Sequence, residues 1–185
     1  MIRALAALAL LLPGQALACA CCAEPGERST ITHAIQHAGD VGAAMARAGQ
    51  AHLFTTACGY ECVEGIVDPD DLYDLKVDNA AGDVVISLTG ASGTGELHLA
   101  LPATFTQFKV DLEPEIAPMT ALYVERRFTV GVTGHGAFKT DWPLVGELVL
   151  SGFGNHCQDA LESTHWTLGV DQVGARYRLF GRFPD

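Results

Sequence analysis

The second half of the chain alternates between apolar and polar residues, and this alternation constrains the fold more than any other feature of the sequence. Side chains of a β-strand point to opposite faces in turn, so an apolar residue at every second position marks a strand with one buried face. Seven short segments carry the pattern, and turn-forming residues separate them. Their apolar positions are Val84, Ile86 and Leu88; Leu97, Leu99 and Leu101; Phe108, Val110 and Leu112; Phe128, Val130 and Val132; Leu148 and Leu150; Trp166, Leu168 and Val170; and Tyr177 and Leu179.

These segments are close together and no helical pattern separates them, which is typical of an antiparallel meander. About eight to ten such strands would leave long unpaired edges in an open sheet, so they are expected to close into a barrel or to fold into two packed sheets. We therefore expect a mainly β fold, an antiparallel meander that forms a barrel. A two-sheet sandwich is the alternative, because the period of the sequence does not separate the two.

One helix is expected before the strands, between Pro25 and Gly49. Apolar residues there fall three and four positions apart, Ser29 or Thr30 can cap a first turn, and Gly49 can end the last one. The spacing predicts a helix over about 30–48. Its apolar stripe consists of Ile31, Ala34, Ile35, Ala38, Val41, Met45 and Ala48.

The first 18 residues have the composition of a cleavable secretory signal. A positive charge at Arg3 precedes an apolar run over 4–12, and residues 16–18 (Ala-Leu-Ala) form a small-x-small cleavage site. An apolar run of about nine residues is roughly half of the 20 or so that cross a bilayer as a helix, so no transmembrane anchor is expected. We expect an exported protein, periplasmic or secreted, with a single domain over 19–185.

Cleavage after Ala18 would leave Cys19 at the new N-terminus, the position at which a bacterial lipoprotein carries its lipid. The preceding Ala16 and Leu17 do not match the usual residues of a lipidation site, so a lipid anchor at Cys19 is the less favoured alternative.

The charge of the chain excludes several classes of partner. It has 22 Asp and Glu against 11 Lys and Arg, a formal net charge of −11, and loss of Arg3 with the signal would make it −12. Such an acidic surface repels nucleic acid and anionic lipid. The classes of partner that this charge does not exclude are a small ligand, a metal ion and another protein.

Six cysteines fall in the expected mature chain, and an exported setting favours disulfides among them. Cys58 and Cys62 are the best local pair, because Gly59 between them eases a tight turn. Cys157 needs a distant partner, for which an N-terminal cysteine such as Cys22 is a candidate. The pairing itself stays open.

The stretch from Cys19 to Cys22 also places three thiols and an α-amine within four residues, a group that favours a soft metal, copper as Cu(I) before zinc. His33 and His37 are four positions apart and would share one side of the predicted helix, where they could hold a metal ion. The alternatives are disulfide staples with a spare cysteine, and two exposed histidines without a ligand. The candidate metal ligands are Cys19, Cys21, Cys22, His33 and His37.

The sequence gives weaker evidence for a catalytic site than for a metal site. Cys157 follows His156, and His165 is near in sequence, but strand alternation sets His165 on the face opposite Trp166 and nothing places it beside Cys157. His98 is expected on the face opposite its neighbouring leucines. A thiol-dependent enzyme is therefore the third alternative.

Four stretches of the sequence resemble uncharacterised small exported bacterial proteins. They are the mature start Cys-Ala-Cys-Cys-Ala-Glu-Pro-Gly, the loop Gly-Phe-Gly-Asn-His-Cys at 152–157, Thr-His-Trp at 164–166, and Tyr177-x-Leu179-x-Gly181. The resemblance implies a bacterial periplasmic or secreted setting, but it carries no activity. Our leading hypothesis is an exported binding protein for an unknown ligand, with copper a candidate at the N-terminal cysteines. A structural or interaction β-domain with disulfide staples and no metal comes second.

Overall fold

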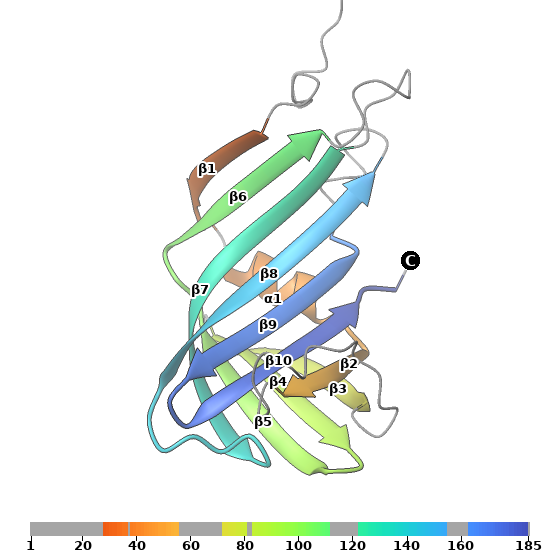
Figure 1. Ribbon diagram of the computed structural model, residues 1–185, viewed down its shortest axis with the longest axis vertical. Helices are drawn as coiled ribbons and strands as arrows, with labels where there is room; N and C mark the ends of the chain where they lie inside the picture. Colours follow the sequence, from red (N-terminus) through yellow and green to blue (C-terminus); the bar gives the residue numbers. More distant parts are fainter. Residues whose placement is uncertain are drawn as a thin grey trace, which may run out of the picture.

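A computed structural model describes residues 28–36, 38–55, 72–80, 83–111, 122–154 and 163–184. This part of the chain is mainly β and forms a closed barrel of eight antiparallel strands, with two further strands outside the ring and one short helix (Figure 1). The predicted barrel is confirmed, and the sandwich alternative is wrong because the sheet closes on itself.

Eight strands form the ring, and each pairs with the next in chain order except that β6 is left out. The last of them, β10, pairs with the first, β2, so the ring has no open edge. The seven segments predicted from alternation correspond to β4 to β10, whereas β2 and β3 were not predicted. The ring consists of β2 (Gln50–Thr55), β3 (Leu72–Ala80), β4 (Asp83–Gly90), β5 (Gly93–Ala100), β7 (Leu122–Gly136), β8 (Leu144–Gly154), β9 (His165–Gln172) and β10 (Ala175–Arg182).

The two outer strands, β1 (Arg28–Ala34) and β6 (Thr104–Asp111), extend the sheet beyond one end of the barrel. The long strand β7 makes this possible: along one edge it pairs with β6 over 122–127 and with β5 over 131–136, while β8 takes its other edge. We call β1, β6 and residues 122–127 of β7 the flange. It forms the top of the molecule in Figure 1, above β3, β4 and β5.

The barrel is filled by the apolar side chains that the alternation predicted to be buried. Trp166, Leu168 and Leu148 are fully buried, and Trp166 packs over Gly181 on the neighbouring strand, where a Cβ atom would lie 2.5 Å from its Nε1. The flange strand β6 departs from the prediction, because Gln107 on its supposedly polar face is buried and Phe108 is only half-buried.

The helix is shorter than predicted and begins later. Helix α1 covers Ala38–Met45, whereas 28–34, most of which was predicted to be helical, form strand β1 paired along its length with β6. The prediction over 30–48 is therefore wrong in its first part. Thr30, Ile31 and Thr32 are β-branched, which favours a strand wherever a partner strand is available, and β6 supplies one.

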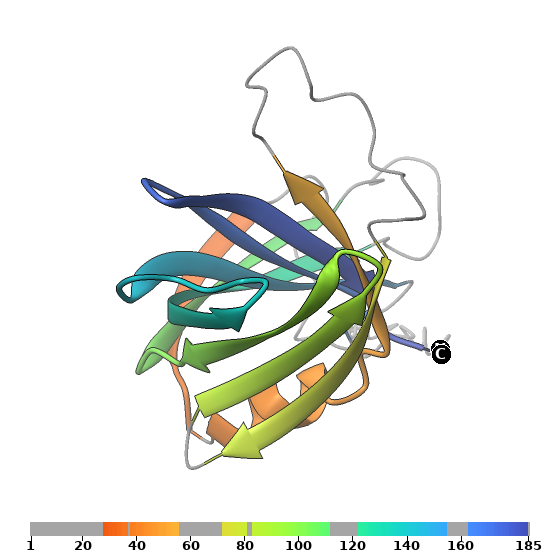
Figure 2. The ribbon, with the colours of Figure 1, turned by 90° about the horizontal axis from the view of Figure 1, so that it is seen from below.

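Helix α1 lies at the end of the barrel from which the flange extends, beside β3 and β4 (Figure 2). Near its start, the Asn79 side chain donates a hydrogen bond to the Gly39 carbonyl at 3.3 Å. Just beyond its end, Arg47 donates to the Ser163 carbonyl at 3.1 Å and lies over the ring of Phe183. The helical segment thus contacts β3 and β4 on one side, and beyond its last turn it contacts the residues just before β9 and just after β10.

Candidate ligand-binding pocket

A pocket of about 340 Å³ lies between α1 and the inner face of the flange. It is bounded by side chains from four strands and the helix, most of them apolar. This size and composition are typical of small-molecule sites. The lining residues are His33, Ala34, Ile35, Gln36, Asp40, Val41, Ala44, Phe105, Arg126, Phe128 and Leu150.

Three rings form one wall of the pocket in a row across the sheet. His33 on β1 is directly opposite Phe105 on β6, and their rings stack with centroids 5.3 Å apart. Phe105 stacks in turn on Phe128 of β7 at 5.1 Å, with an interplanar angle of 25°. Direct cross-strand opposition fixes the spacing of such rings, so the wall is set by the register of the flange.

Two basic side chains bring polar atoms to this apolar site. The Nε2 atom of His33 is buried and has no hydrogen-bond partner among the described residues. Arg126 lines the same pocket, and burial lowers the pKa of its guanidinium below the ordinary 12.5, which still leaves it charged at neutral pH. A buried nitrogen without a partner is unfavourable by about 1–3 kcal/mol, so a ligand atom that bonds to it would be favoured.

A larger hollow of about 1050 Å³ lies mostly on the outer face of β7, β8, β9 and β10. Two of its acidic groups are paired with neighbours: Glu125 accepts a hydrogen bond from Arg127 Nε at 2.6 Å, and Asp171 pairs with Arg176 at 3.2 Å. The pocket under α1 differs in that the buried Nε2 of His33 has no hydrogen-bond partner among the described residues.

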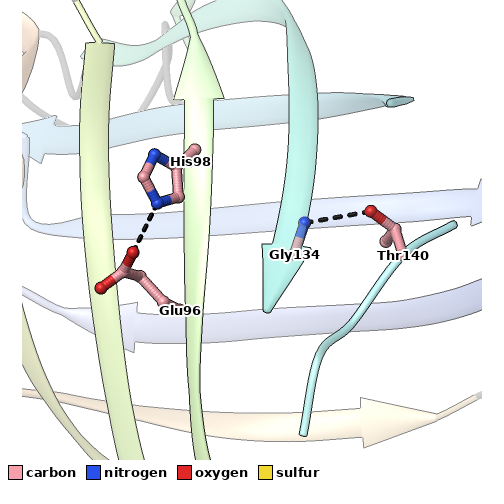
Figure 3. Close-up of polar contacts among 4 residues, drawn as sticks. All are labelled: Glu96, His98, Gly134 and Thr140. Atoms are coloured by element: carbon pink, nitrogen blue, oxygen red, sulfur yellow. Dashed lines mark hydrogen bonds and ion pairs between the residues drawn. The ribbon is translucent and has the colours of Figure 1, made fainter. Parts of the chain in front are cut away.

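His98 lies on the outer face of β5, as predicted, where its Nε2 is 2.5 Å from Glu96 Oε1 (Figure 3). The His135 ring is close by, with centroids 5.2 Å apart. Even so, no group of three His, Cys, Asp or Glu side chains in the described part of the chain has the geometry of a metal site.

The barrel interior also holds buried polar atoms, near the end opposite α1. There Tyr73 and Tyr177 both pack edge-on against Phe138. The hydroxyl of Tyr177 is buried without a hydrogen-bond partner among the described residues. Since the surroundings are aromatic and apolar, this hydroxyl weakens the fold.

Replacing Tyr177 by phenylalanine is therefore expected to raise the free energy of unfolding by about 1 kcal/mol at neutral pH. Burial raises the pKa of Tyr177 from 10.0 to about 12, so the unfolded chain ionises first and the natural protein loses stability as pH rises between these values. Phenylalanine does not ionise, so the variant lacks this loss in the free energy of unfolding, which is on the order of 2 kcal/mol. Denaturant unfolding at pH about 8 and about 11.5 measures both effects.

The matched control is Tyr123→Phe, because the Tyr123 hydroxyl does have a partner and donates to Glu125. This variant is expected to gain no stability at neutral pH. If both variants are equally stable there, the buried Tyr177 hydroxyl is not a source of instability.

Of the residues predicted as metal ligands, the structure describes only His33. His33 lies on strand β1 and lines the pocket, so the prediction that it shares a helix face with His37 is wrong, because 28–34 form a strand. His37 itself lies outside the described residues, as do all six cysteines, including the disulfide candidates. The copper site and the disulfides stay predictions. The cysteines concerned are Cys19, Cys21, Cys22, Cys58, Cys62 and Cys157.

The sequence did not point to most of the pocket. Arg126 and Arg127 appear as an isolated basic pair, yet they lie on opposite faces of β7: Arg126 enters the pocket, and Arg127 pairs with Glu125 outside. Phe105 was missed because Phe108 and Val110 suggested the other face of β6 as the buried one. The available signal was that Phe105 and Phe108, three residues apart, place one aromatic ring on each face of β6.

The described part of the chain contains no helix long and apolar enough to span a membrane. No family model matches the chain, and neither the curated proteins nor the solved structures include a match to it.

Proposed function

We propose that the protein is an exported binding protein that holds a small aromatic molecule in the pocket between α1 and the flange. The predicted export signal over 1–18 supports an extracytoplasmic setting. Soft-metal binding by Cys19, Cys21 and Cys22 is a separate prediction of the sequence and does not depend on this pocket.

The observation that carries the proposal is the His33 ring. It ends a row of stacked rings, lines a mainly apolar pocket, and keeps a buried Nε2 without a hydrogen-bond partner among the described residues. An apolar cavity with one or two directed polar groups selects ligands that combine a ring with a single polar atom. Neutral imidazole can accept or donate at Nε2, so a ring hydroxyl or ring N–H would suit it.

Phenol and toluene test this proposal, because they differ only in the polar group. The natural protein is expected to bind phenol about tenfold more tightly than toluene, since one hydrogen bond contributes about 1.4 kcal/mol. His33→Phe keeps a ring in the stack but removes Nε2, so the two probes should then bind equally. Ligand-observed NMR or calorimetry with each probe gives the ratio.

Two further variants locate the site. Ala44→Phe, on the helical wall of the pocket, is expected to remove binding of both probes by filling the space. His98→Phe makes the same change as His33→Phe but on the outer face of β5, and should leave the tenfold preference intact. Failure of the natural protein to bind either probe would contradict the proposal and favour the structural or interaction domain.

A further inference from the structure

Strand β1 differs from the other strands in how it is paired. Within the described residues it forms one end of the pairing order and bonds to β6 alone, whereas the barrel strands close into a ring. In the part of the chain that the structure describes, no strand lies beside its other edge, which presents backbone N–H and C=O groups. Such an edge is a template for pairing with another extended chain.

Apart from Arg28 at its start, the edge of β1 lacks the usual features that block such pairing. All seven residues of Arg28–Ala34 pair one-to-one with β6 without a bulge, and the strand contains no proline, lysine or acidic residue. Ile31 at its centre is 50% exposed. Natural edges are normally protected by charges, prolines or bulges, so an open apolar centre indicates an occupant.

We propose that this occupant is a second copy of the chain, with the two β1 strands antiparallel about a two-fold axis at Ile31. Ile31 is the midpoint of Arg28–Ala34, so the full strand pairs with itself in a single register. The side chains then match without a clash of charge: Ile31 meets its own copy, Thr30 meets Thr32, and Ser29 meets His33. Opposed apolar and Thr–Thr pairs stabilise antiparallel strands.

Charge favours a second copy over a different peptide. The strand has one permanently charged side chain, Arg28, and in this register it faces Ala34 of the other copy. An acidic or basic peptide would find little on β1 to complement it. The net charge of the chain opposes association at long range, but physiological salt screens that repulsion beyond about 8 Å.

The resulting dimer would join two flanges into one continuous sheet. Such an interface is isologous, since the same strand contributes from both copies. Because His33 lies on β1, the two ligand pockets would lie on either side of the joint. The inference does not depend on the pockets binding any ligand.

Sedimentation velocity over a range of concentrations tests the dimer, with reductant present to prevent cross-links between the natural cysteines. The purified protein is expected to pass from monomer to dimer as its concentration rises. Ile31→Lys sets two positive charges against each other at the two-fold axis, and the dimer should be lost. Val173→Lys adds the same charge at a valine that is 82% exposed on the β9–β10 turn, and should leave the dimer unchanged.

A cysteine trap tests the register. Ile31→Cys brings two thiols directly opposite each other, so mild oxidation should give a covalent dimer in high yield. Ser29→Cys is the matched control, because the two copies of that residue would be about 13 Å apart along the strands, beyond the reach of a disulfide. A natural protein that stays monomeric, a dimer that survives Ile31→Lys, or equal cross-linking of the two cysteine variants would each overturn the proposal.

Discussion

Replacing Gly134 by alanine is expected to lower the free energy of unfolding by about 3 kcal/mol, because overpacking of this kind forces the backbone to move. A Cβ atom at Gly134 would lie 1.8 Å from the carbonyl oxygen of Phe138 and 2.8 Å from its carbonyl carbon. Backbone atoms cannot swing aside as the end of a flexible side chain can. The turn after β7 would have to shift.

That turn is held tightly, which is why a shift is unfavourable. The Gly134 N–H donates to Thr140 Oγ1 at 3.1 Å (Figure 3), and the Thr140 N–H donates to the Gly134 carbonyl, also at 3.1 Å. Between them Phe138 is buried against Tyr73 and Tyr177. Moving the turn therefore disturbs the packing at this end of the barrel.

Gly131→Ala is the matched control, since it lies on the same strand and the nearest atom to its Cβ would be the Ala100 Cβ at 3.4 Å. This variant should be neutral or slightly more stable, because alanine loses less backbone entropy than glycine on folding. Chemical denaturation of both variants gives the comparison. Equal stability of the two would show that the turn adapts to the added methyl group.

The alternation of the sequence predicted the barrel well, because burial inside a closed ring of strands depends on a period that is visible in the chain. Leu97 and Leu99 are fully buried, and His98 between them faces out. Closure itself follows from pairing between β2 and β10, strands far apart in the sequence. From the sequence, closure was favoured only because an open sheet of this many strands would leave long unpaired edges.

The same reasoning failed at β1 and at the pocket for a physical reason. Ile31 and Ile35 are four residues apart, which fits a helix, and the pattern contains no information about the β6 edge that turns 28–34 into a strand. The pocket wall combines His33, Phe105 and Phe128, which only the register of three strands brings together. Spacing along one segment does not predict such a site.

Helix α1 joins the stability of the barrel to the formation of the pocket, and Met45→Ala tests the connection. Met45 is fully buried, and its truncation is expected to lower the free energy of unfolding by about 3 kcal/mol. The helix has only eight residues and includes Gly39 and Gly42, so its own propensity is too weak to hold it in place without packing. The control Met45→Leu keeps the volume and should lose less than about 1.5 kcal/mol.

The same variant should weaken binding of phenol and toluene, although Met45 is not among the residues that line the pocket. Asp40, Val41 and Ala44 form the helical wall, and they hold their positions only while Met45, one turn along the helix from Val41, stays packed in the core. Denaturant unfolding and probe titration on Met45→Ala and Met45→Leu therefore measure two results of one contact. Loss of stability with unchanged probe binding would show that the pocket forms without a docked α1, and the site would then have to be sought on the flange alone.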